Sequence, residues 1–151
     1  MKPAKETKAV KHPYQRAAHN ILHTAGWLQN KMIHTLRGYD LSEPQYNVLR
    51  ILHGQNGTAM NLFEIQELMA QKDSNVSRII DKLCDKQFVV RRVSKTNKRK
   101  VDIVITQKGV KALDVVNPAM EKMLSEIFEG VKKEKMKTLS KMLDSLMESH
   151  M

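Results

Sequence analysis

The sequence predicts a mainly α-helical (α+β) fold with one two-stranded β-hairpin near the middle of the chain. Through most of the 151 residues, apolar side chains recur at steps of three and four, the spacing of amphipathic helices. Two β-branched or aromatic runs, at residues 88–90 and 101–105, interrupt this pattern and predict strands. A hydrophobic content of 41% with 5% aromatic residues supports one domain with a modest core of Leu, Ile, Val and Met.

The N-terminal region predicts a tail followed by the longest helix. Residues 1–12 are rich in lysine and lack apolar periodicity, so we expect a flexible basic tail, with phosphate contact and plain disorder as open alternatives. Pro13 suits a first helical position and Gly38 a helix stop, which bounds a helix over residues 13–38. Its apolar residues form a heptad seam, the spacing of helix-against-helix packing: Tyr14, Ala18, Ile21, Ala25, Leu28 and Met32.

A second helix is predicted from Ser42, as its N-cap, to Gly54. Ser42 and Gln45 have the spacing of a capping box, in which each side chain accepts from the backbone N–H of the other residue. Four apolar residues follow within the helix: Val48, Leu49, Ile51 and Leu52. Residues 55–59 then predict a loop.

The most informative stretch runs from Asn61 to Thr106. Asn61 can cap a short helix, with Glu64 as the reciprocal partner of a second capping box. Three apolar residues fall on one face of that helix: Ile65, Leu68 and Met69. A polar run then ends the pattern, and Asp73 or Ser74 can cap the next helix.

This next helix has one apolar face and one polar face. The inward positions, spaced i, i+3, i+4 and i+7, are Val76, Ile79, Ile80 and Leu83. The outward positions are Ser74, Asn75, Ser77, Arg78 and Lys82. An exposed helix with Ser, Asn and Arg in its first turns offers the donors and acceptors that reach base edges in a DNA major groove.

The predicted hairpin carries a strong positive charge. Residues 86–100 contain seven basic residues and no acid: Lys86, Arg91, Arg92, Lys95, Lys98, Arg99 and Lys100. Such a loop favours a phosphate backbone or a minor groove as its partner, and a merely solvated loop is the alternative. Because the hairpin directly follows two helices joined by a tight turn, we favour a winged helix-turn-helix head that contacts DNA.

At these residues the chain resembles the MarR family of bacterial winged helix-turn-helix regulators. Residues 41–49 (LSEPQYNVL) are similar to the family's L-[ST]-x-P-Q-x-x-[VL]-L helix, and residues 74–83 (SNVSRIIDKL) to its recognition helix. Residues 97–99 (NKR) stand where the family has Asp-x-Arg at the wing tip. Residues 106–109 (TQKG) resemble the T-x-x-G that opens the next helix. The resemblance runs from about residue 13 to the C-terminus, and the ordered set of motifs is specific although each is weak alone.

The chain departs from the family pattern at two positions. Asn97 replaces the wing acid, so the resemblance carries over no negatively charged partner for Arg99. Gln87 stands where the family usually has Gly, at a position that often needs positive φ. Positive φ costs a non-Gly residue roughly 1 kcal/mol or more, so a different helix cap is the alternative.

The C-terminal third predicts two more helices. Residues 107–130 form an apolar helical run, and Pro118 inside it should kink the helix or divide it. A last helix is predicted over about residues 132–149. With the N-terminal helix, these helices carry more apolar surface than a small head can cover.

We therefore expect a single domain over residues 13–151 that has a DNA-binding part and a dimerisation part. Residues 41–106 would form the DNA-binding winged helix, and residues 13–38 and 107–149 would pack against a second copy of the chain as dimerisation helices. The family resemblance implies the same homodimer.

Composition narrows the remaining function classes. A net charge of +10, from 26 basic and 16 acidic residues, favours an anionic partner, either nucleic acid or a membrane surface. The sequence has no apolar run near the ~20 residues of a membrane span and no signal peptide, so a cytoplasmic protein is expected. A single cysteine excludes an intramolecular disulfide framework. Without a Gly-rich phosphate loop, an H-E-x-x-H or a Ser-centred motif, we expect no enzyme.

The resemblance also implies sensing, either of a small molecule between the dimer helices and the head or of thiol oxidation. For Cys84, a small buried hydrophobe is favoured over a redox switch. His19 and His23 could share a metal, but ordinary helix-surface histidines are favoured, and we expect no metal or cofactor. Four residues could line an apolar pocket, with plain dimer core as the favoured alternative: Trp27, Met32, Met120 and Met123.

These inferences predict a homodimeric transcription regulator, a ligand-responsive repressor that binds double-stranded DNA at a near-palindromic operator. The predicted major-groove contacts are Ser74, Asn75, Ser77 and Arg78, with Lys82 near phosphate. Arg99 is predicted to enter the minor groove, while the backbone is held by Lys95, Lys98 and Lys100. Two alternatives remain open: a non-specific architectural or RNA-binding protein, and a winged helix whose basic face meets an acidic protein.

Overall fold

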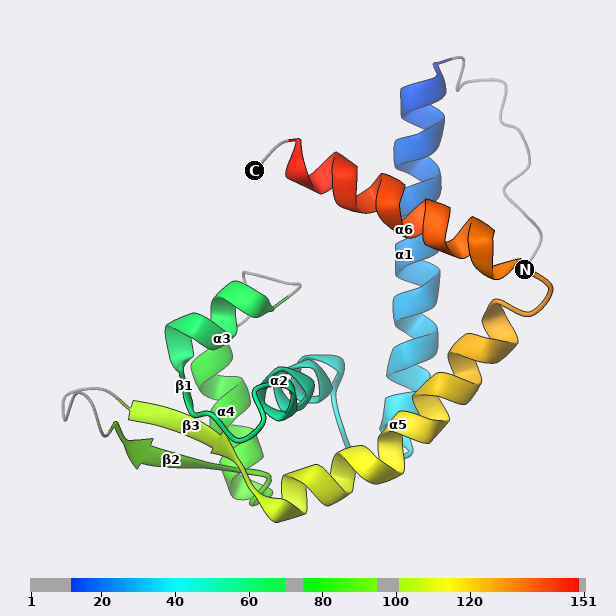
Figure 1. The fold of residues 1–151 in the computed structure, drawn as a ribbon. Coiled ribbons are helices and arrows are strands. Elements are labelled where there is room, and N and C mark those ends of the chain that lie inside the picture. Colours follow the sequence, from blue (N-terminus) through cyan, green and yellow to red (C-terminus); the bar gives the residue numbers. More distant parts are fainter. Residues whose placement is uncertain (1–11, 70–74, 95–100, 150–151) are drawn as a thin grey trace.

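The computed structural model describes residues 12–69, 75–94 and 101–149. These ranges form six helices and three strands, in the order α1 (Pro13–Arg37), α2 (Glu43–Gly54), β1 (Met60–Asn61), α3 (Leu62–Leu68), α4 (Val76–Asp85), β2 (Val89–Val93), β3 (Val101–Ile105), α5 (Gln107–Ile127) and α6 (Lys133–Glu148). Figure 1 shows a head made of α2, α3, α4 and the sheet, with α1, α5 and α6 extending away from it. The mainly helical fold with a winged helix-turn-helix head is confirmed. We call residues 41–106 the winged head.

The helix starts follow the local signals in the sequence. The Gln45 N–H donates to Ser42 Oγ at 3.4 Å and the Ser42 N–H donates to Gln45 Oε1 at 3.1 Å, which completes the first predicted capping box. At α3 the Glu64 N–H donates to Asn61 Oδ1 at 3.1 Å, and the Asn61 N–H donates to Glu64 Oε2 at 2.8 Å. Both boxes satisfy N–H groups that have no partner inside the helix.

The predicted cap of α4 is wrong. Asn75 caps this helix, and its Oδ1 accepts from the Arg78 N–H at 3.1 Å, in place of Asp73 or Ser74. Asn is among the strongest N-cap residues, and its side chain has the reach to bond the N–H three residues on. As a result, α4 begins at Val76.

The apolar face predicted for α3 is only partly correct. Ile65 is fully buried and Met69 is 4% exposed, but Leu68 is 54% exposed. The helix has only seven residues and ends at Leu68, so Met69 reaches the core from extended backbone rather than from the helix face. Leu68 is therefore left outside the core.

The sheet has three antiparallel strands in the order β1-β3-β2, where the sequence predicted two. The two-residue strand β1, which pairs Met60 with Ile103, lies in a segment too short to show alternation. Strand β2 begins one residue later than predicted and continues into the basic segment through Val93. It does so because β3 offers a partner at each position, down to the pair Val93–Val101.

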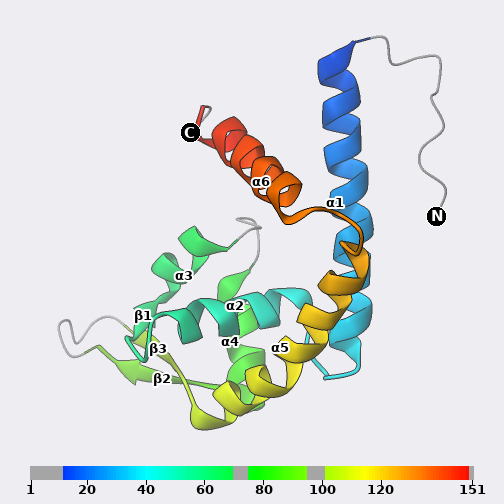
Figure 2. The ribbon, with the colours of Figure 1, turned by 45° about the vertical axis from the view of Figure 1, so that its right-hand side comes forward.

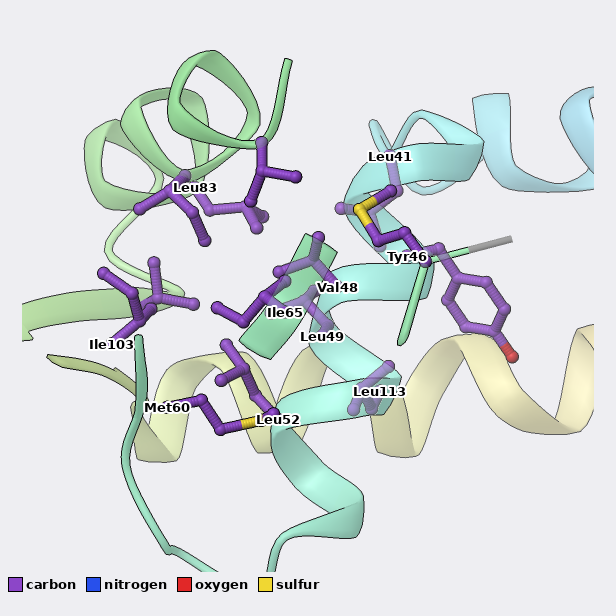
Figure 3. Packing of buried hydrophobic residues seen from close by; sticks show 14 of the residues in the cluster. Leu41, Tyr46, Val48, Leu49, Leu52, Met60, Ile65, Leu83, Ile103 and Leu113 are labelled. Carbon is purple, nitrogen blue, oxygen red and sulfur yellow. The ribbon is translucent and has the colours of Figure 1, made fainter. Parts of the chain in front are cut away.

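The core lies where α2, α3, α4, α5 and the inner face of the sheet meet. Figure 3 shows Val48, Leu49 and Ile65 at its centre, with Leu83 and Ile103 closing one side. The predicted inward residues of α4 are confirmed: Val76, Ile80 and Leu83 are buried and Ile79 packs against the cluster. Further along, the Tyr46 hydroxyl donates to Asn117 Oδ1 at 2.9 Å and joins α2 to α5. Burial raises the pKa of Tyr46 above its usual value.

Helix α5 passes through Pro118 without dividing. Figure 1 shows it curving upwards from the winged head towards α6. A bend of this kind is the expected response to a proline that removes one backbone hydrogen bond. One helix therefore connects the wing to the C-terminal region.

The end of α4 is built around Gln87, which adopts a φ of +61°. The Phe88 N–H donates to the Leu83 carbonyl at 2.9 Å and the Gln87 N–H donates to the Cys84 carbonyl at 2.8 Å. These two bonds form a Schellman motif, the helix ending that usually contains Gly. The family's helix ending is thus kept with a non-Gly residue at the left-handed position.

The start of α5 packs directly against this ending. Thr106 Oγ1 donates towards the Gln87 carbonyl at 2.7 Å and accepts from the Gly109 N–H at 3.1 Å. A Cβ at Gly109 would collide with the carbonyl oxygen of Phe88. The T-x-x-G pattern therefore combines a helix cap with a close backbone approach that needs glycine.

No helix in the described part of the chain combines the length and apolar character needed to cross a membrane.

Replacing Gln87 by Gly should stabilise the protein by about 0.5–1 kcal/mol, because Gly removes the strain of positive φ. The gain is reduced by loss of the exposed hydrogen bond that Lys108 Nζ donates to Gln87 Oε1 at 3.1 Å. The matched variant Gln87→Ala loses the same bond but keeps the strain. Urea unfolding of all three proteins checks this, and a Gly variant no more stable than the Ala variant would refute the strain at this position.

Candidate nucleic-acid interface

The polar face of α4 is open to solvent. Ser77, Arg78 and Lys82 are exposed, whereas Val76, Ile80 and Leu83 on the other side are buried. The spacing of the buried residues fixes this orientation, because 3.6 residues per turn leave one stripe free. The helix thus presents a guanidinium, an ammonium and a hydroxyl group outward, as predicted.

Asn75 is exposed as well, but its side chain has a structural task. Its oxygen accepts from the Arg78 N–H and keeps a second lone pair, while its amide NH₂ group can donate elsewhere. This cap restricts how the Asn75 side chain can turn towards a base edge, and its predicted base contact stays a prediction. Ser74 lies outside the described residues.

Sequence reasoning missed an ion pair on this same face. Arg91 on β2 places its guanidinium 2.6 Å from Asp81 Oδ1 on α4. The side chains are 39% and 54% exposed, so the pair lies at the surface between the recognition helix and the wing. Strand alternation carried the signal, since Arg91 is two residues from the buried Val89 and shares its face of the sheet.

A second ion pair ties the end of α4 to the corner between α1 and α2. Lys86 Nζ lies 2.9 Å from Asp40 Oδ2 and also donates to the Asp40 backbone carbonyl. Asp40 has a φ of +52°, a conformation that Asp tolerates better than most residues. With Arg91 on one flank and Asp40 on the other, α4 is held at both sides.

The wing continues the positive surface of the head. Arg91 and Arg92 are exposed on β2. Four predicted contacts lie outside the described residues and remain predictions: Lys95, Lys98, Arg99 and Lys100.

Cys84 is half-buried near the end of α4. Burial raises the pKa of its thiol, and the charge of Arg91 opposes this only in part. A raised pKa disfavours the thiolate, the form that oxidants and disulfides react with. The structure therefore favours the small-hydrophobe interpretation of Cys84.

The other sensing candidates lie on or near α1. The rings of His19 and His23 stack with centroids 6.0 Å apart on the exposed part of this helix. Within the described ranges, no group of three or more His, Cys, Asp or Glu side chains could hold a metal. Met120 belongs to the core, and Met32 and Met123 pack against it, while Trp27 is half-buried.

The arrangement has clear relatives among known proteins. Residues 41–101 match the MarR family. The transcriptional repressor YetL of Bacillus subtilis (strain 168), of the helix-turn-helix type, is 26% identical over 121 residues, which cover 80% of this chain and 72% of YetL.

Solved structures share the fold over nearly the whole chain. The organohalide-sensing regulator RdhR-CbdbA1625, bound to 2,4-dichlorophenol, superimposes with a TM-score of 0.83 and 14% identity, covering 99% of this chain and 90% of that one. MepR of S. aureus, in complex with DNA, superimposes with a TM-score of 0.77 and 16% identity, covering 89% and 96%. The winged head is therefore a MarR-family domain, and the chain as a whole shares the fold of solved MarR-family regulators.

Proposed function

We propose that this regulator is a homodimeric repressor that binds duplex DNA in a sequence-specific manner through α4 and the wing. The exposed face of α4 carries the proposal, since it aligns Ser77, Arg78 and Lys82 beside the basic strand β2. Arg pairs well with guanine edges in the major groove, and Lys neutralises phosphate. The DNA complex of the similarly folded MepR and the repressor role of YetL support the proposal.

Dimerisation is supported by apolar side chains that the chain itself does not cover. No residue of α6 is buried, and Leu139, Leu143 and Leu146 are between 38% and 52% exposed. On the N-terminal half of α1, Leu22 is 73% exposed and Ile21 is 40% exposed. Figure 2 shows both segments standing clear of the winged head. Apolar stripes of this kind favour burial against another helix, and a second copy supplies one.

A dimer would also allow the protein to recognise a longer DNA site than a single head can contact. One recognition helix reaches only a few base pairs, whereas two heads about one helical turn (roughly 34 Å) apart read both halves of a near-palindrome. Two-fold symmetry of the protein then matches two-fold symmetry of the site.

The proposal includes a response to a small molecule that binds near α4. A groove of about 700 Å³ lies at the α1–α2 corner, with Arg37 and Asp40 on one side and Lys82 and Lys86 of α4 on the other. A ligand there would touch both the dimer helix and the recognition helix. The 2,4-dichlorophenol complex of the similarly folded RdhR supports the proposal that a small molecule is bound.

The main alternative is a non-specific architectural or RNA-binding protein that uses the same basic surface. Equal affinity for unrelated duplexes, or a preference for single-stranded RNA, would favour it. An acidic protein partner would be favoured by the absence of duplex binding at low salt.

Arg78→Ala should relax base specificity at one position and cost about 1–3 kcal/mol on the preferred site if the guanidinium makes a bidentate base contact. Lys98→Ala should instead weaken binding to all duplexes about equally and lower the salt slope by about one unit. Titration of labelled specific and scrambled duplexes at several salt concentrations separates the two. Identical behaviour of both variants would contradict the division between base-reading and phosphate-holding residues.

Leu143→Glu should shift the protein from dimer towards monomer, because it places a charge in the apolar stripe of α6. Ser145→Glu is the matched control, since it adds the same charge to the same helix on the polar side. Sedimentation equilibrium at micromolar concentration measures both masses. A monomeric mass for the unmodified protein would rule out the dimer.

A further inference from the structure

The recognition face of α4 carries two carboxylates among its basic groups. Asp81 and Asp85 are both exposed, one turn apart, on the same side of the helix as Arg78. A negative charge near DNA repels phosphate groups and lowers affinity for every sequence. Acids at this place therefore oppose the binding that the rest of the head promotes, and need a reason of their own.

Asp81 differs from Asp85 in being held by the wing. Its Oδ1 lies 2.6 Å from a guanidinium nitrogen of Arg91, so the two groups form a close ion pair. The carboxylate is still 54% exposed, so the ion pair does not remove it from the surface. Among the described residues, no further hydrogen bond or ion pair to this carboxylate is found, which leaves lone pairs for a partner outside the chain.

The sheet determines which arginine holds Asp81. Arg91 pairs with Ile103 across the sheet, and directly paired residues of antiparallel strands point to the same side. Ile103 is fully buried, so Arg91 extends from the inner face of the sheet towards α4, whereas Arg92 is on the opposite face. The position of Asp81 is therefore coupled to the wing and not only to its own helix.

We propose that Asp81 is a specificity-determining residue, which accepts a hydrogen bond from an amino group on a base edge in the major groove, and that Arg91 is its positioning residue. This inference rests on the proposed DNA-binding function. In the major groove only cytosine N4 and adenine N6 donate, while guanine N7 and O6, adenine N7 and thymine O4 accept. A carboxylate only accepts, so it matches the amino groups and is repelled by sites that place an acceptor there.

The ion pair with Arg91 allows a carboxylate to lie close to DNA for two reasons. Arg91 offsets part of the negative charge, which limits the general loss of affinity. It also restricts the rotamers of Asp81, so that the free lone pairs are fixed in direction. Asp81 then discriminates between duplexes mainly by weakening binding to sites that place an acceptor opposite it, and less by strengthening binding to the preferred site.

The test compares Asp81→Asn with Asp85→Asn, a control that removes the same charge from the next turn of the same face. Each protein is given a random duplex library and then a panel of single-base variants of the preferred site. Both variants should bind random duplexes more tightly than the unmodified protein, since each loses one negative charge. Only Asp81→Asn should lose preference at one base pair per half-site, by about fivefold or more.

Arg91→Gln tests the positioning role. It should weaken preference at the same base pair as Asp81→Asn, without creating a new one. Added to Asp81→Asn, it should cause no further loss of preference there, because the carboxylate it orients is gone. Arg91→Lys, which keeps the charge, should restore part of the preference. Thermal unfolding should show all variants folded, since a surface ion pair contributes little to stability.

The outcomes distinguish a failure of the role of Asp81 from a failure of the proposed DNA-binding function. If the unmodified protein selects a site and Asp81→Asn keeps every base preference, the role of Asp81 is refuted while the proposed function stands. If the unmodified protein selects no site, the proposed function fails first. Equal loss of preference in Asp81→Asn and Asp85→Asn would show a general charge effect and overturn the assignment.

Discussion

The orientation of the recognition helix depends on the contact between its C-terminal end and the first turn of α5. Thr106 and Phe88 lie 18 residues apart in the chain, yet the Thr106 N–H donates to the Phe88 carbonyl at 3.0 Å. Thr106 Oγ1 adds a bond to the Gln87 carbonyl, and Gly109 leaves space for the Phe88 backbone. Strand β3 leads directly into this junction. The C-terminal end of α4, the end of β3 and the start of α5 are therefore joined at one set of backbone contacts.

In the proposed function, this junction would also connect DNA binding to dimerisation. Helix α5 is continuous from Gln107 to Ile127, so it leads without interruption from the winged head to the turn before α6. On the other side, the bonds from Lys86 to Asp40 join α4 to the end of α1. The two attachments relate each head to the helices that carry exposed apolar side chains. In a dimer, the spacing between two recognition helices would follow from them.

Local signals accounted for most of the fold. The caps at Ser42 and Asn61 and the ends of α1 follow from residues within one turn of each boundary, which is why sequence alone predicts them. The features that the sequence did not predict depend on contacts between segments that are far apart in the chain. Strand β1 exists because β3 lies beside it, and the exposure of Leu68 follows from where the core lies. Asn75 is an exception, because its capping role is local and the sequence offered several capping residues in a row.

The candidate DNA-binding surface shows the same contrast between local signals and contacts that depend on packing. Helical periodicity correctly placed Ser77, Arg78 and Lys82 outward, because one turn of helix relates them to buried neighbours. The ion pair of Asp81 with Arg91 could not be read from either segment, since it depends on how the sheet packs against α4. Strand alternation predicts the face that Arg91 occupies. Only the packed structure shows which helical residue it meets.

Selection of tight binders from a random duplex library tests the central claim most directly, at a fixed salt concentration of about 150 mM because phosphate contacts alone shift affinity by orders of magnitude. The account predicts enrichment of a near-palindromic site whose half-sites are about one helical turn apart. That result would establish the dimer and the reading of base edges together. A library returned without enrichment would contradict sequence-specific recognition and leave a basic winged fold that binds nucleic acid by charge alone.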